Sequence, residues 1–160
     1  MPYYKCSDRF PIRKNPRLKD FDYSAHNYYF VTICTWNKIC LFGSPTKLSQ
    51  AGNIAADCLQ QIESHFPGIL VDKWIVMPNH IHAIVSMPGS GTTLSTVVGQ
   101  YKAAVTKKIH IYHSNICVWQ PSFHDHVIRN QTDYERIWAY IDTNPARWID
   151  DCFYTPQPDR

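Results

Sequence analysis

Short apolar runs along the chain alternate with longer segments in which apolar residues recur at helical spacing. The runs are rich in β-branched and aromatic residues, which is the composition of strands. Turn-forming residues bound them, and Pro78-Asn79 joins two of the runs closely enough for a hairpin-like pair. The pattern predicts strands at residues 28–36, 69–76 and 80–87, and a fourth, short strand at residues 116–120.

The longer segments predict three helices. Within residues 49–66 an apolar residue recurs every fourth position until Pro67-Gly68 ends the helix. A second apolar stripe predicts a helix at residues 93–109. Thr132 with Glu135 fits a capping box, which predicts that the last helix opens there.

The resulting order β-α-β-β-α-β-α predicts an α+β fold, with a ferredoxin-like or RRM-like antiparallel sheet covered on one side by helices. At 160 residues and 44% hydrophobic content, we expect one domain with a substantial core. We divide the chain into a basic arm (residues 1–27), the domain itself (28–150) and a C-terminal tail (151–160). No apolar run approaches the ~20 residues of a membrane span, and no secretory leader opens the chain. The expectation is a cytoplasmic protein.

The net charge of +3 is mild, but its distribution is uneven. Lysines and arginines crowd the first twenty residues, where Arg13, Lys14 and Arg17 are candidates for contacts with nucleic-acid phosphates. A solvated tail is the equal alternative. The six cysteines include no C-x-x-C pair, so we expect them to be structural thiols.

Two histidines carry the first chemical signal. Side chains alternate faces along a strand, so His80 and His82 should point the same way while Ile81 points into the opposite layer. Paired imidazoles suit a divalent cation. In the last helix, Tyr140 and Asn144 lie one turn apart, about 6 Å along the axis, on the flank of the apolar stripe. A phenol placed there can reach a site.

These residues resemble those of a known family. The chain is similar to the HUH single-tyrosine transposases, named for a His-hydrophobic-His motif, and within them to the REP-associated tyrosine transposases of bacteria. Four stretches carry the resemblance: residues 29–33 (YFVTI), 77–82 (MPNHIH), 119–129 (WQPSFHDHVIR) and 140–145 (YIDTNP).

The resemblance implies an enzyme that cleaves and rejoins single-stranded DNA near hairpin or REP-like sequences. It implies Tyr140 as the nucleophile of a 5′-phosphotyrosine intermediate. It further implies that His80, His82 and Asn144 hold one Mg²⁺ ion, or Mn²⁺ in its place. The protein would then be nucleoid-associated and either a monomer or a homodimer.

A second His-x-His at residues 124–126 competes with the first pair. His124 departs from the family pattern, whereas His126 fits it, and Asp125 or His126 could support the site. Lys102 and Arg129 are candidate phosphate binders, with a solvated face as the competing interpretation. Trp119 either packs or stacks on a base.

Three other functions remain open at this point. The first is a domesticated protein that binds hairpin DNA without cleaving it. The second is a rolling-circle replication initiator, although such proteins usually continue into further domains. The third is an unrelated zinc protein that uses the thiols and the second histidine pair.

Overall fold

The computed structural model describes residues 26–89 and 91–156, so the basic arm with Arg13, Lys14 and Arg17 lies outside the described residues. A four-stranded sheet in the order β2-β3-β1-β4 forms the centre of the molecule, and all neighbouring strands are antiparallel. The predicted α+β fold is confirmed. The strands are β1 (His26–Cys34), β2 (Leu70–Met77), β3 (His80–Pro88) and β4 (His124–Ile128).

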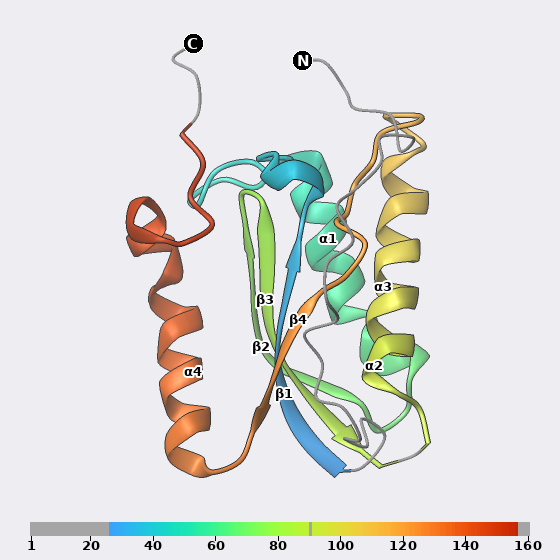
Figure 1. Ribbon diagram of the computed structural model, residues 1–160. Coiled ribbons are helices and arrows are strands. Elements are labelled where there is room, and N and C mark those ends of the chain that lie inside the picture. The colour runs from blue at the N-terminus through green and yellow to red at the C-terminus, as the bar shows by residue number, and fades with distance from the viewer. Residues whose placement is uncertain (1–25, 90, 157–160) are drawn as a thin grey trace.

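Helices cover both faces of this sheet (Figure 1). One face carries α1 (Gln50–Gln60), α2 (Ile62–His65) and α3 (Leu94–Ile109), and the other carries α4 (Gln131–Thr143). The prediction of one covered face is therefore wrong. Both faces of the strands are apolar: a small cluster of Ile84, Ile128, Ile137 and Ile141 packs between the sheet and α4, apart from the main core. No helix in the described part of the chain is long and apolar enough to cross a membrane.

The register of β3 decides which face receives the histidines. Ile81, Ala83 and Val85 point into the main core beside α1 and α3. The alternate residues point towards α4, and Thr32 of β1 lies opposite His82. Each histidine is fully or almost fully buried. The hairpin of β2 and β3 thus places the pair under α4 at one end of the sheet.

Residues 116–120 do not form the fourth strand, which corrects the prediction. They make one isolated bridge, Thr35 to Trp119, while β4 pairs with β1. Their apolar side chains, such as Val118, fill the end of the main core, and Pro121 has no N–H to continue a ladder. The edge strand β4 escaped prediction because its His-Asp-His sequence lacks the apolar signature of a strand.

The helix predicted at residues 49–66 is divided in two. Ser49 caps α1 by accepting a hydrogen bond from the Gly52 N–H. At Gln61 the backbone turns to ψ −8°, which interrupts the helix before α2 begins. Two short 3₁₀ turns complete the chain: η1 (Trp36–Lys38) follows β1, and η2 (Asn144–Asp150) follows α4.

The cap of the last helix lies two residues before the predicted one. Asn130 is the N-cap, and its Oδ1 accepts a hydrogen bond from the Asp133 N–H at 2.8 Å. Thr132 is an exposed residue within the helix, so the predicted capping box is wrong. Asn130 satisfies an otherwise unpaired N–H at the end of the element that carries Tyr140.

Replacing Asn130 with alanine should lower the free energy of unfolding by about 1 kcal/mol, because an N–H of the first turn loses its acceptor. Thr132→Ala is the matched control and should change stability by less than about 0.5 kcal/mol. Urea unfolding of both variants measures the difference. An equal loss of stability in the two variants would contradict the assignment of the cap.

Candidate functional site

The candidate site lies where β2 turns into β3, between that end of the sheet and the last turn of α4 (Figure 1). The first two residues of β3 that face α4 are His80 and His82. Tyr140 comes from α4, and Asn144 begins η2. Asp151 directly follows η2. Three elements, β3, α4 and η2, and the segment after η2 therefore contribute to one place.

Hydrogen bonds hold both imidazoles in a defined orientation. The two ring centroids are 4.5 Å apart. His80 Nδ1 lies 2.9 Å from Asn79 Oδ1, and His82 Nδ1 lies 2.8 Å from Thr32 Oγ1. When each Nδ1 carries its proton towards an oxygen, each Nε2 presents a lone pair to the site. This is the tautomer that a metal-binding histidine uses.

Burial keeps both histidines uncharged at neutral pH. It lowers the pKa of His80 to about 3, although the neighbouring Asn144 side chain acts to raise it. Burial also lowers the pKa of His82 to about 3, and the neighbouring His80 adds to the effect. The charged form is disfavoured because the low-dielectric interior cannot solvate it. Neutral imidazoles are the form that binds a cation.

Unpaired nitrogen and oxygen atoms converge beside the histidines, which is the arrangement that a cation requires. His80 Nε2 and Asn144 Oδ1 are both buried without a hydrogen-bond partner. Asp151 Oδ2 lies 3.8 Å from His80 Nε2 and accepts a hydrogen bond from Asn144 Nδ2 at 2.8 Å. Ligand atoms of His80, His82 and Asp151 all lie within 4.8 Å of one another. Two imidazoles with oxygen donors suit a divalent first-row ion such as Mn²⁺.

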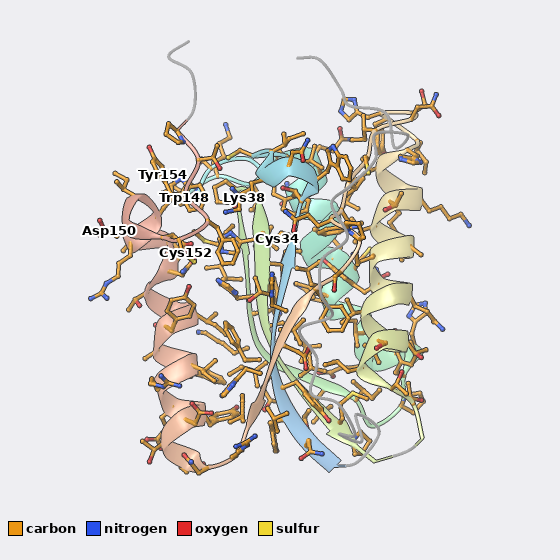
Figure 2. All side chains as sticks on the ribbon, viewed as in Figure 1. Cys34, Lys38, Trp148, Asp150, Cys152 and Tyr154 are labelled. Carbon is orange, nitrogen blue, oxygen red and sulfur yellow. The ribbon has the colours of Figure 1, made fainter. Side chains whose placement is uncertain are left out.

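Asp151 is the site residue that sequence reasoning missed, because the residue falls in the segment assigned to a tail. Its side chain is only 1% exposed. The turn of η2 brings it back to the sheet, and Phe153 packs its ring 4.6 Å from that of His80. Figure 2 shows Asp150 on the outer side of this turn and Cys152 on the side that faces the sheet. An acidic residue seven positions after Asn144 was the one available signal.

The candidate nucleophile borders this group of ligands. Tyr140 is 41% exposed, and its hydroxyl lies 3.4 Å from His82 Nε2. Its ring meets that of Phe30 edge-on. Partial burial and the nearby Asp151 raise the pKa of Tyr140 to about 12. The phenol therefore needs a positive charge beside it to become a nucleophile at neutral pH.

The second His-x-His is not part of this centre. His124 lies across Thr32 from His82 but is exposed at the sheet edge. His126 pairs with Asp133 of α4 at 2.7 Å, and Asp125 stands on the strand face opposite to both histidines. Within the described residues no second group of three such ligands converges. None of the described cysteines belongs to this group of ligands.

The structure places the other candidates away from the histidines. Lys102, on the far side of the sheet, donates to the Gln120 carbonyl oxygen, and burial lowers its pKa to about 8. Arg129 is exposed just before the cap of α4, whereas Tyr140 lies in the last turn of that helix. Trp119 is buried and donates to the Lys102 carbonyl, so it packs.

Several known proteins resemble this chain, although no protein-family model matches it. An uncharacterised protein of Haemophilus influenzae is 32% identical, over 89% of this chain and 93% of its own length. The REP-associated tyrosine transposase of Escherichia coli K12 is 31% identical over 81 residues. That match spans about half of either protein, 49% of this chain and 47% of the transposase.

Two solved structures share the fold. A REP-associated tyrosine transposase bound to a REP hairpin superposes with a TM-score of 0.66 at 24% identity, covering 85% of this chain and 74% of that one. A candidate transposase of Deinococcus radiodurans has a TM-score of 0.52 at 17% identity, covering 79% and 97%. Sequence and fold agree with the motifs: over about half of its length the chain resembles a REP-associated tyrosine transposase, and it shares the fold of the hairpin-bound one.

Proposed function

We propose that this protein cleaves and rejoins single-stranded DNA beside a hairpin, with Tyr140 as the nucleophile and one divalent cation held by His80, His82 and Asn144. One observation carries the proposal: the Tyr140 hydroxyl lies 3.4 Å from a lone-pair nitrogen of a buried, uncharged histidine pair. Beside that nitrogen, His80 Nε2 and Asn144 Oδ1 are buried without a hydrogen-bond partner, and such groups are candidates for a functional site.

The chain's own residues account for the covalent step. The Tyr140 oxygen attacks the phosphorus, forms a new P–O bond and loses its proton to water at its exposed edge. The P–O3′ bond breaks, and the departing oxygen takes a proton to become a free 3′-hydroxyl. A bound cation would polarise a non-bridging phosphate oxygen. Because the 5′-phosphotyrosine conserves the energy of the broken bond, a 3′-hydroxyl can reverse the step and join strands without ATP.

The ligand set bears on the identity of the ion. Family resemblance favours Mg²⁺, whereas two imidazoles favour Mn²⁺ or a later metal. Asp151 would add an anionic oxygen, which both Mg²⁺ and Mn²⁺ accept readily. We therefore propose Mn²⁺ or Mg²⁺, with Mn²⁺ as the more tightly bound of the two ions.

Hairpin DNA is the proposed partner. The structural neighbour in this family holds a REP hairpin. In this chain, Arg13, Lys14 and Arg17 of the arm and the exposed Arg129 are proposed phosphate contacts. Lys102 is a weaker candidate, because backbone carbonyls already occupy its ammonium group. Since Tyr140 contacts His82 of the same chain, the proposal suits a monomer.

Replacing Tyr140 with phenylalanine should abolish covalent attachment to DNA and leave DNA affinity nearly unchanged, because the phenol does chemistry and contributes little to binding. The assay is a denaturing gel with a hairpin oligonucleotide labelled at its 3′ end, the end that stays on the enzyme. Tyr134→Phe on the same helix is the control and should keep full attachment, since its hydroxyl bonds Asp72 instead. Adducts formed by Tyr140→Phe would place the nucleophile elsewhere.

His80→Ala and His82→Ala should each reduce metal-dependent cleavage by orders of magnitude, because removing a ligand loosens both the ion and the phosphate it orients. Asn144→Ala should be milder and partly rescued by more Mn²⁺. Calorimetric titration of the DNA-free protein with Mn²⁺ should follow the same order. His124→Ala is the control and should bind Mn²⁺ as the wild type does. If His124→Ala lost Mn²⁺ binding and His80→Ala kept it, the second His-x-His would be the metal site.

Removal of residues 1–20 should weaken hairpin binding and flatten its salt dependence if the arm binds phosphates. Every lysine or arginine of the arm that neutralises a phosphate should contribute about 0.7–0.9 to the slope of log affinity against log salt, and the truncation should remove that contribution. Cleavage at saturating DNA should survive, since the proposed ligands and nucleophile lie beyond residue 79. An unchanged slope would identify the arm as a solvated tail.

A further inference from the structure

The side chain of Asn79, in the turn before β3, is completely buried and bonded at both ends. Its Nδ2 donates to the carbonyl oxygens of Lys38, at 3.1 Å, and Phe153, at 2.8 Å. Thr155 Oγ1 lies 3.2 Å from the same nitrogen. On the other end, Asn79 Oδ1 lies 2.9 Å from His80 Nδ1. One amide therefore joins two segments that are distant in the sequence to the adjacent His80.

The chemistry of these partners fixes the orientation of the amide. Carbonyl oxygens only accept hydrogen bonds, so the side that faces Lys38 and Phe153 must be the NH₂ group. The side that faces His80 is then the oxygen, which can only accept. His80 Nδ1 must donate, and its Nε2 must carry the lone pair. The orientation of Asn79 thus decides which nitrogen of His80 is free for a cation.

The backbone around Asn79 is held as firmly as its side chain. Its carbonyl oxygen accepts from both the N–H and the hydroxyl of Thr35. Asn37 and Lys38 adopt positive φ angles of 48° and 54°, which are uncommon for residues other than glycine. This unusual turn directs the Lys38 carbonyl at the Asn79 amide. Backbone conformations of this kind persist where the surrounding structure enforces them.

The contact of Asn79 with Phe153 also positions Asp151, the fourth candidate ligand. The Phe153 N–H donates to Asp151 Oδ1 at 2.7 Å, while its carbonyl accepts from Asn79. The Phe153 ring packs on His80. An amide that holds Phe153 therefore also holds Asp151 beside His80 Nε2.

We infer that Asn79 is a positioning residue for the metal centre, which sets the tautomer of His80 and at the same time docks residues 151–155 onto the site. This inference rests on the proposed metal-dependent function. The C-terminal segment then becomes part of the metal centre, since the same amide holds His80 directly and Asp151 through Phe153. Asparagine alone among similar side chains does both, because aspartate cannot donate to Phe153 and leucine can neither donate nor accept.

Two substitutions at this position separate the two roles. Asn79→Leu should lower the Mn²⁺ affinity of the DNA-free protein by about 10–100-fold, the usual effect of losing a residue that orients a ligand. Asn79→Asp should bind Mn²⁺ with an affinity between those of wild type and Asn79→Leu, because a carboxylate still accepts from His80 Nδ1. Both should raise amide exchange in residues 151–155. Asn53→Asp, exposed on α1 across the sheet, is the control and should change none of these.

Nitrogen-15 spectra of the metal-free protein report the tautomer directly. Wild type and Asn79→Asp should show His80 protonated at Nδ1, and Asn79→Leu should show a mixture. Thr155→Val, which removes the hydroxyl beside Asn79 Nδ2 but leaves the amide itself, should raise exchange in residues 151–155 and leave the tautomer intact.

Wild-type Mn²⁺ affinity and tautomer in Asn79→Leu would overturn the inference, as would equal losses of affinity in Asn79→Leu and Asn79→Asp. Unchanged exchange in both variants would overturn the docking role. If the wild type binds no Mn²⁺, the proposed function fails in its metal requirement. The tautomer and exchange measurements then decide the inference by themselves.

Discussion

Burial of two uncharged imidazoles at one end of the sheet is the constraint on which the rest of the site depends. A strand normally turns one face to the core and the other to water, but β3 is covered on both. The histidines therefore lose solvation without gaining a charge, and their ring nitrogens must find partners within the protein. Asn79 and Thr32 satisfy one nitrogen of each ring. The other nitrogen of each ring faces Asn144, Asp151 and Tyr140. These two nitrogens are the proposed ligand atoms for a cation.

The segments that cover the histidine pair come from the part of the chain after β4. The helix α4 supplies Tyr140, and η2 turns the chain so that Asp151 and Phe153 return to the rings. This return is what buries Asp151 beside the histidines. The strand that carries the histidines, β3, comes earlier in the chain, and the residues after η2 pack over it.

The sequence predicts the elements that depend on a local pattern of residues. It misses the features that arise when distant segments of the chain pack together. The hairpin of residues 69–87 follows from its apolar runs and from Pro78-Asn79, and the common face of His80 and His82 follows from strand alternation. The polar edge strand β4 and the position of α4 on the second face leave no periodic signal. Asp151 could not be predicted as a site residue either. Its approach to His80 depends on the seven-residue turn η2, for which the sequence shows no pattern. Asn130 was missed because Thr132 offered a competing cap of equal local quality.

The two hydrophobic clusters differ greatly in size, and this has a consequence for the order in which the molecule opens. The main core joins three helices to the sheet, whereas α4 rests on the small cluster of Ile84, Ile128, Ile137 and Ile141. Opening free energy follows buried apolar contact, so α4 can detach as a unit while the other layer stays folded. The proposed nucleophile thus lies on a helix held by the smaller cluster, whereas the strand that carries the histidines also packs into the main core. A covalently held DNA end would move with the helix, while the two histidines on β3 stayed in place.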